Sequence, residues 1–350
     1  MVTPISRSLL GVVALSICLF ACAVSAAEPM GQVQHDVVFT EYSPLSGSLE
    51  LARRMLTPLT FAQLESEAAR RNVKLREQSV DLANEKFTLF VPAQAPPKGY
   101  SLLVFIAPWQ GAGVPQDWIS ALDRHGMIFV TAANSGNTEN VFERRVPLAL
   151  IAAHNVMQRY PVDKDRLYIG GMSGGSRVAL RMALAYPDVF RAVLLHSGSD
   201  RIGTLETPLP ATPLFNHLQE SMRFVYLTGE NDRVNLDTDV ESRSSLQNWC
   251  AYDIDVEPFP FAGHQLAGSR DIDLALTALG GHVSPRPDRL ATCRAQRAKD
   301  IGTQLQEVQE LLGRGKSSDA RKLLKKIDIH YAGLAAPESV ELAAKMESGH

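Results

Sequence analysis

The sequence predicts an α/β fold, in which helices cover both faces of a mostly parallel β-sheet and a C-terminal helical extension follows. Seven short apolar, β-branched runs recur between residues 87 and 261, and amphipathic stretches of helical length separate most of them. Strands that are apolar along their whole length are typical of sheets buried on both faces. The runs stop after about residue 283, where helical patterns alone remain.

The strands and helices can be placed along the chain from these patterns. The predicted strands are FTLFVPA (87–93), SLLVFIAP (101–108), MIFVTAAN (127–134), RLYIGGM (166–172), AVLLHSG (192–198), RFVYLTG (223–229) and DVEPFPF (255–261). Helical spacing of apolar residues predicts helices over 144–160 and 176–186, the second ending before Pro187. Together these elements predict one α/β domain over residues 27–283.

Two segments of this domain are less regular. Residues 27–85 combine a strand-like VVFTEY with charged helical patterns, and we expect them to extend the sheet by an edge strand or hairpin. The proline-rich segment TLETPLPATPLF (204–215) is expected to form a loop beside the site. It is either a partial lid or an ordinary connection stiffened by proline.

The first 26 residues predict a secretory signal peptide. Arg7 precedes the apolar run at 9–21, and small residues at 24–27 offer a cleavage site. Thirteen apolar residues are too few to cross a bilayer core. The segment LFAC (19–22) also resembles a lipoprotein box, so Cys22 is an alternative lipid-anchor site. Either way we expect an exported protein, periplasmic or secreted.

The composition gives no sign of a nucleic-acid-binding or metal-binding protein. The chain has 350 residues, is 45% hydrophobic and 21% charged, and carries a formal charge of −3, which gives no reason to expect a nucleic-acid partner. Outside the predicted leader, only Cys250 and Cys293 remain. In an oxidising compartment they can form a disulfide, and otherwise they are two buried thiols. No cysteine or histidine cluster predicts a metal, and oligomeric state is not predicted.

Residues 284–350 are expected to form the C-terminal helical segment. Three amphipathic stretches between 291 and 346 predict three helices, in a style similar to a single tetratricopeptide-like unit. One such unit cannot stack on itself, so it should pack on the preceding domain or on a partner.

The stretch YIGGMSGGSR (168–177) contains the principal candidate site. Gly171-Met172-Ser173-Gly174-Gly175 follows the pattern G-x-S-x-G and lies between a predicted strand and a predicted helix. In that context the serine occupies a sharp turn that projects its hydroxyl above the sheet. Gly171 and Gly175 avoid clashes with the neighbouring strand and helix.

A serine hydroxyl needs a base and an acid to become a nucleophile, and the chain supplies both in the expected order. Asp232 follows the strand RFVYLTG, and His264 follows the last predicted strand on a glycine-flanked turn. Ser173 would attack, His264 would take and return the proton, and Asp232 would orient the imidazole. The rival acids are Glu230 and Asp200; the rival histidines are His125, His154, His196 and His282.

Residues 85–283 resemble the α/β-hydrolase superfamily, on the stretch YPVDKDRLYIGGMSGGSRVALRMALAYPDVFRAVLLHSGS followed by LTGENDRVN and PFAGHQLAG. They are most similar to the polyhydroxybutyrate depolymerase and feruloyl esterase-like group of secreted serine esterases. The resemblance implies an α/β-hydrolase fold and hydrolysis of carboxylic esters, small or polymeric, through an acyl-enzyme without a cofactor.

One segment departs from that group. Such esterases usually carry His-Gly after the strand that corresponds to SLLVFIAP, and a backbone N–H there helps to bind the oxyanion. This chain has Ala107-Pro108-Trp109-Gln110-Gly111 instead. Because proline has no N–H, we expect Trp109 and Gly174 to supply the oxyanion donors; Trp109 is otherwise an acyl-pocket wall or a core residue. Two alternatives to an esterase stay open: a peptidase that uses the same residues, and a catalytically weak binding protein.

Overall fold

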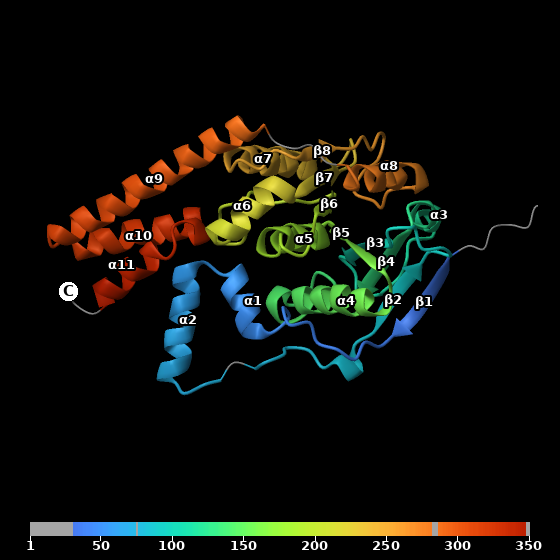
Figure 1. Cartoon of the computed structure of the whole chain (residues 1–350), viewed down its shortest axis with the longest axis horizontal. Helices are drawn as coiled ribbons and strands as arrows, with labels where there is room; N and C mark the ends of the chain where they lie inside the picture. Colours follow the sequence, from blue (N-terminus) through green and yellow to red (C-terminus); the bar gives the residue numbers. More distant parts are fainter. Residues whose placement is uncertain (1–30, 75, 282–285, 348–350) are drawn as a thin grey trace, which may run out of the picture.

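The computed structural model describes residues 31–74, 76–281 and 286–347 (Figure 1). The predicted signal peptide with Cys22 and the rival His282 therefore lie outside the described residues. The described strands form one eight-stranded sheet: β1 (Gln32–Val37), β2 (Phe87–Val91), β3 (Tyr100–Ile106), β4 (Met127–Ala132), β5 (Val162–Met172), β6 (Ala192–His196), β7 (Arg223–Leu227) and β8 (Ile254–Val256).

The described helices account for most of the remaining chain. The α-helices are α1 (Ser48–Met55), α2 (Pro58–Arg70), α3 (Ile119–Arg124), α4 (Val146–Arg159), α5 (Gly174–Ala185), α6 (Thr212–Ser221), α7 (Arg233–Asn248), α8 (Ser269–Leu279), α9 (Pro287–Gly313), α10 (Ser317–Tyr331) and α11 (Glu338–Glu347). Shorter turns are the 3₁₀ segments η1 (Leu82–Asn84), η2 (Gln116–Trp118) and η4 (Ala332–Leu334) and the π-helical η3 (Val141–Arg145).

The sheet has the strand order β1-β2-β4-β3-β5-β6-β7-β8. β2 pairs antiparallel with both β1 and β4, whereas every later neighbouring pair is parallel. β4 pairs with one side of β3, and the chain then crosses over so that β5 pairs with the other side of β3. The connections that leave β3 and β5 therefore run toward opposite edges, and ligands of open α/β sheets bind at such a point.

Helices cover both faces of the sheet (Figure 1). Alternate residues of the fully buried β3 belong to different core clusters, as the period of a strand requires. Leu102 and Val104 pack in the cluster that contains residues of α1, α4, α5 and α6. Leu103 and Phe105 pack in the cluster that contains residues of α3 and α8. The predicted mostly parallel sheet with helices on both faces is confirmed.

Two strand boundaries differ from the prediction. The N-terminal edge strand ends at Val37, so VVFTEY contributes only its first residue. The register shifts just before this point, Asp36 has a φ of 52°, and Phe39 turns inward against Phe87 with 4.5 Å between ring centroids. At the other edge β8 is shorter than the predicted DVEPFPF, since prolines at 258 and 260 lack the N–H that a strand ladder needs.

The predicted C-terminal helical extension is present as α9, α10 and α11, which lie beside α6 and α2 (Figure 1). Their apolar residues, among them Leu305 and Leu324, join the core cluster of α4 and α5. The buried Asp328 of α10 accepts hydrogen bonds from Thr57 Oγ1 at 2.5 Å and from the Leu59 N–H at 3.0 Å. This carboxylate thus caps the first turn of α2, where negative charge is favourable.

The proline-rich segment before α6 contacts the same extension. The Gly333 N–H donates to the Leu209 carbonyl at 2.9 Å, and Gly203 lies against Trp249 and the His330 carbonyl. Thr207 in this segment is fully buried. These contacts favour the interpretation as a connection over that of a partial lid.

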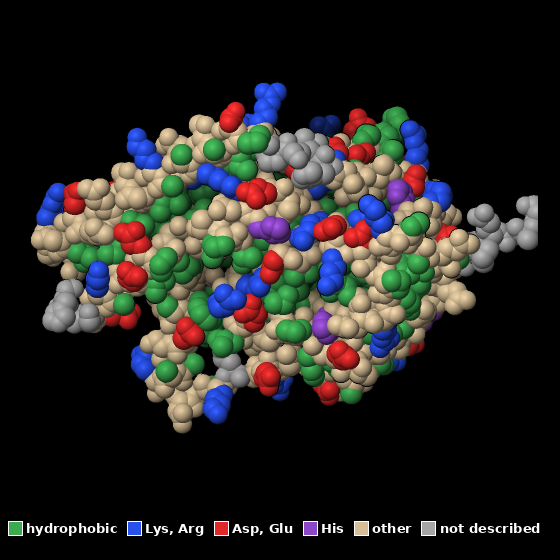
Figure 2. Space-filling view, in the orientation of Figure 1, with side chains coloured by type: hydrophobic (Ala, Val, Ile, Leu, Met, Phe, Trp, Pro, Cys, Tyr) green, Lys and Arg blue, Asp and Glu red, His purple; other side chains and the backbone are tan. Residues whose placement is uncertain are grey.

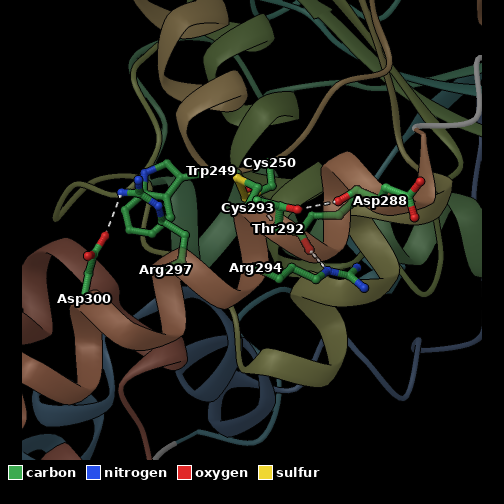
Figure 3. The surroundings of a disulfide bond; sticks show 9 residues. Trp249, Cys250, Asp288, Thr292, Cys293, Arg294, Arg297 and Asp300 are labelled. Atoms are coloured by element: carbon green, nitrogen blue, oxygen red, sulfur yellow. Dashed lines mark hydrogen bonds and ion pairs between the residues drawn. A yellow bond between two sulfur atoms is a disulfide. The ribbon is translucent and has the colours of Figure 1, made fainter.

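A disulfide joins Cys250, just after α7, to Cys293 in α9, with 6.0 Å between the Cα atoms (Figure 3). In Figure 3 the Arg297 side chain of α9 lies beside the Trp249 ring next to this bond. The bond therefore attaches the first helix of the extension to the end of α7.

Replacing both cysteines with serine is expected to lower the free energy of unfolding by about 2–4 kcal/mol. The bond links residues 43 positions apart, so its loss frees a long loop in the unfolded chain. Urea unfolding of the double variant and of the oxidised wild type measures the difference. The wild type treated with reductant serves as the control and should approach the double variant; equal midpoints for all three samples would contradict the prediction.

The surface carries both signs of charge. Figure 2 shows lysine and arginine side chains interspersed with aspartate and glutamate on the face that it displays. Of the helices in the described ranges, none combines the length and the apolarity that a membrane span requires.

Candidate active site

Ser173 occupies the turn between β5 and α5 in a strained conformation, with φ 55° and ψ −122°. Its N–H donates to the carbonyl of His196 at the end of the neighbouring β6, at 2.8 Å. A non-glycine residue persists in such a conformation only where the surrounding structure enforces it. The turn is the one that G-x-S-x-G predicted between a strand and a helix.

Close backbone packing explains the glycines around the serine. A Cβ on Gly175 would overlap the Ile106 carbonyl of β3, and a Cβ on Gly171 would overlap the backbone of Gly175. Gly198, after β6, approaches Ser173 closely enough that a Cβ there would overlap the serine carbonyl. Gly171 and Gly175 therefore lie where the sequence placed them, whereas the need for Gly198 was not predicted.

The structure brings Ser173, His264 and Asp232 together. His264 Nε2 lies 3.0 Å from Ser173 Oγ, and His264 Nδ1 lies 2.7 Å from Asp232 Oδ2. A carboxylate only accepts hydrogen bonds, so the Nδ1 proton points to Asp232 and Nε2 is left to accept from the serine hydroxyl. Asp232 is buried, while the His264 side chain is 44% exposed. This arrangement can move a proton from the serine to the imidazole.

Asn235 holds the carboxylate of Asp232 from the first turn of α7. Its Nδ2 lies 2.9 Å from each carboxylate oxygen, and its Oδ1 accepts from Arg177 Nη2 at 3.2 Å. Arg177 in turn forms an ion pair with Asp200. The sequence did not predict Asn235 as a site residue, although its place three residues after the acid on a helix puts it in reach.

The loops that carry the acid and the histidine are joined by backbone hydrogen bonds. The N–H of Glu230 donates to the Phe259 carbonyl at 3.0 Å, and that of Asn231 donates to the Ala262 carbonyl at 2.8 Å. A Cβ on Gly229 would overlap the Ala262 carbonyl, so a glycine is required where the loops approach. These contacts fix the separation of Asp232 and His264 despite the early end of β8.

A second buried carboxylate ties this acid loop to the loop after β6. Asp239 of α7 accepts from Ser199 Oγ at 2.5 Å and from Thr228 Oγ1 at 2.6 Å. Burial raises the pKa of Asp239, against the opposite effect of the two hydroxyls. Asp239 therefore holds the loops after β6 and β7 together, and none of its described contacts is with Ser173.

His196 and Trp118 anchor the chain just after His264. The Ala267 N–H donates to His196 Nε2 at 3.0 Å, and Trp118 Nε1 donates to the Ala267 carbonyl at 2.9 Å. Both side chains are fully buried, and their rings stack with centroids 6.5 Å apart. Because Nε2 accepts a hydrogen bond here, the contact requires a neutral imidazole.

Acid is expected to destabilise the protein through His196. Burial, and secondarily the nearby His264, lower the pKa of His196 to about 4. Below its ordinary pKa of about 6.5, the unfolded chain binds a proton that the folded chain takes up only near pH 4. This group alone should therefore reduce the free energy of unfolding by on the order of 2–3 kcal/mol as the pH falls across that window.

Urea unfolding at pH 7.5 and pH 4.5 tests this expectation with His196→Gln, whose amide can still accept from Ala267. The variant should lose less stability on acidification than the wild type. His125→Gln is the control, since His125 is partly exposed beside Asp273. Equal acid-induced losses for wild type and His196→Gln would contradict the assignment.

The rival residues have other partners. Glu230 is exposed and accepts from the Phe261 N–H at 3.2 Å. Asp200 pairs with Arg177, His125 lies 3.1 Å from Asp273, and His154 Nε2 lies 3.6 Å from Glu41. None of the described contacts of Glu230, Asp200, His125 and His154 is with Ser173 or with the ring of His264, and the ring of the remaining described rival, His196, contacts Ala267 instead.

The expected oxyanion donors lie on the two loops that meet beside Ser173. Gly174 is the first residue of α5, so its N–H has no acceptor within the helix. Trp109 lies on the loop after β3 and is 37% exposed, which argues against the alternative of a core tryptophan. Among the described residues neither N–H donates to a protein acceptor, so both are free to bind a substrate oxygen. No group of His, Cys, Asp and Glu in the described ranges has a metal-binding arrangement.

The chain has an α/β-hydrolase fold, as shown by the order of its strands, the strained turn at Ser173 and the helices on both faces of the sheet. The family model described as Esterase PHB depolymerase matches residues 131–208, which include Ser173 and its glycines. In this segment and in its fold the chain resembles the polyhydroxybutyrate depolymerase and feruloyl esterase-like group, as the sequence indicated. No curated protein matches it.

Several solved structures share part of the fold at low identity. An S-formylglutathione hydrolase (FrmB) from Staphylococcus aureus is 14% identical, with 56% of this chain and 92% of that chain covered and a TM-score of 0.46. A ferulic acid esterase is 18% identical, with 55% and 88% covered and a TM-score of 0.44. An acylaminoacyl peptidase is 14% identical, with 65% and 45% covered and a TM-score of 0.42.

Proposed function

We propose that this protein is an exported serine hydrolase that cleaves carboxylic esters through an acyl-enzyme. The observation that carries the proposal is the contact of 3.0 Å between Ser173 Oγ, on its strained turn, and His264 Nε2. The contact between His264 and Asp232 supports it, because it gives the imidazole the tautomer that accepts a proton. The esterase family match supports the ester class of substrate.

In the proposed reaction the serine oxygen attacks the ester carbonyl carbon while His264 Nε2 takes the hydroxyl proton. The negative charge develops on the carbonyl oxygen, which the N–H groups of Trp109 and Gly174 stabilise. Collapse of this intermediate breaks the bond to the alcohol oxygen, which leaves with the proton from His264. Water then attacks the acyl-serine with the same base, and the carboxylic acid and free serine are released.

A fluorophosphonate probe followed by an ester panel tests the proposal. Purified protein from residue 27 onward should form a covalent adduct at Ser173 and hydrolyse p-nitrophenyl acetate or butyrate. Peptide fluorophores measured beside the esters distinguish an esterase from a peptidase, and the esterase should turn over the esters faster. Folded protein without an adduct and without turnover would instead indicate a binding protein that keeps the fold.

Export can be tested separately. The full chain expressed in a bacterium with a periplasm should appear there without its first 26 residues, which mass spectrometry of the mature N-terminus would show. A mature chain that starts at Cys22 and partitions into detergent would indicate a lipid anchor, and an intact leader in the cytoplasm would contradict export.

A further inference from the structure

The loop after β4 forms one wall beside the predicted oxyanion donors. The Asn137 N–H donates to the Pro108 carbonyl at 3.0 Å, and Gly136 lies against the backbone of Trp109 and Gln110. The Gly136 N–H donates to Gln110 Oε1 at 3.2 Å. The loop after β3, which has proline and tryptophan where related esterases carry His-Gly, is thus held in place by its neighbour after β4.

The side chain of Asn137 lies directly over Gly174, the residue that follows the nucleophile. A Cβ built on Gly174 would overlap Asn137 Oδ1 and would lie 2.8 Å from Cγ and 2.9 Å from Nδ2, so a side chain at this position would displace the amide. Asn137 is exposed, and its Nδ2 donates to no acceptor among the described residues. The Asn137 amide therefore lies against Gly174, and its Nδ2 has no described acceptor.

Arg145 fixes which way this amide points. The Asn137 Oδ1 accepts from Arg145 Nη2 at 3.3 Å, which leaves Nδ2 on the side away from the guanidinium. Arg145 also donates to the Ala107 carbonyl at 3.2 Å, to the Ser135 carbonyl at 2.8 Å and to the Gly174 carbonyl at 3.5 Å. A single buried cation thus binds the three loops that surround the oxyanion position.

The burial of Arg145 agrees with a positioning role. Desolvation, and then the charge of Arg181, lower the pKa of Arg145 to about 10, so the guanidinium still carries its charge at neutral pH. Its described hydrogen-bond partners are three backbone carbonyls and one amide oxygen, with no carboxylate. A cation that is buried in this way favours partial negative charges aimed at it, which are the carbonyl oxygens of the site loops.

We infer that the Asn137 side-chain amide is a third oxyanion donor, placed beside the backbone N–H groups of Gly174 and Trp109 and oriented by Arg145. This inference rests on the proposed ester hydrolysis. A side-chain amide donor acts on the charge that develops in the transition state, and its removal reduces kcat by about 10²–10³-fold. Asn137 thereby supplies a donor at a site whose loop after β3 departs from the usual His-Gly.

Asn137→Ala and Asn137→Asp test the inference, with Thr138→Val as the matched control in the same loop. The alanine variant should lose about 10²-fold in kcat on p-nitrophenyl butyrate, with KM changed less than about threefold, because the bond forms in the transition state. Aspartate has the same shape but no amide donor and adds a negative charge, so its loss should be at least as large. Thr138→Val and the melting temperatures should stay close to wild type.

Hydrolysis of a thionoester distinguishes an oxyanion donor from a residue that only maintains the structure, because loss of a structural residue would lower the oxoester and thionoester rates equally. Sulfur is a weak hydrogen-bond acceptor, so hydrolysis of p-nitrophenyl thionobutyrate depends less on the amide. The ratio of oxoester to thionoester kcat/KM should therefore fall by about tenfold or more in Asn137→Ala. Arg145→Lys, which keeps the charge but loses the planar fork, should lower the same ratio in the same direction.

The outcomes separate the two proposals. Oxoester and thionoester rates that fall equally, or an Asn137→Ala variant within threefold of an active wild type, would overturn the inference alone. A wild-type chain that shows no ester turnover and no adduct at Ser173 would overturn the proposed function and the inference with it.

Discussion

The Ser173→Ala variant is expected to lose ester hydrolysis by about 10⁵–10⁶-fold in kcat while it keeps the wild-type fold. Alanine removes the only atom that the proposed reaction requires at this position, the hydroxyl oxygen 3.0 Å from His264 Nε2. The residual rate would be that of water activated near the remaining oxyanion donors. Initial rates on p-nitrophenyl butyrate, with enzyme concentration raised for the variant, measure the loss.

Ser176→Ala is the matched control for this variant. Ser176 is a buried serine of α5, just after the G-x-S-x-G motif, and its hydroxyl donates to the Gly198 carbonyl. Its removal should cost stability but leave covalent labelling by the fluorophosphonate intact, whereas Ser173→Ala should not be labelled. Turnover by Ser173→Ala within tenfold of the wild type would show that another residue is the nucleophile.

The strained turn at Ser173 could be predicted from sequence because its constraints are local. A strand must turn sharply into a helix, and the overlaps at Gly171 and Gly175 forbid any side chain there. The approach of Asp232 and His264 to Ser173 could be predicted because parallel strands bring their carboxyl ends to one edge of the sheet, and these residues follow successive strands.

The supporting residues could not be predicted in the same way. Asn235, His196 and Asn137 lie on a helix, a strand and a loop, and nothing in the periodicity of one sequence indicates which side chains face the site. Each depends on a close approach between loops that only the folded chain defines, such as the contact of Gly229 with Ala262. The last strand was predicted too long for a similar reason, because β8 ends where prolines interrupt its ladder.

The Asp232→Asn variant is expected to reduce kcat by about 10⁴-fold with little change in KM. An asparagine amide can donate to His264 Nδ1, which favours the tautomer with the proton on Nε2. That nitrogen then faces Ser173 Oγ as a donor and cannot accept its proton. In the wild type the Asn235 amide donates to both carboxylate oxygens of Asp232. In the variant it would have only the side-chain oxygen of the new asparagine as acceptor at this position.

Glu230→Gln is the control that separates the two acids on this loop. Glu230 is exposed, and glutamine retains an oxygen to accept from the Phe261 N–H. The kcat of Glu230→Gln should therefore stay within about threefold of the wild type, since Glu230 only helps to position the loop that leads to His264.

Rates on p-nitrophenyl butyrate from pH 6 to 9 compare the variants, because a wrong tautomer lowers activity at every pH at which the imidazole is neutral. If Glu230→Gln lost activity while Asp232→Asn kept it, Glu230 and not Asp232 would be the acid partner of His264. The contact of 2.7 Å between Asp232 and His264 would then have no catalytic role.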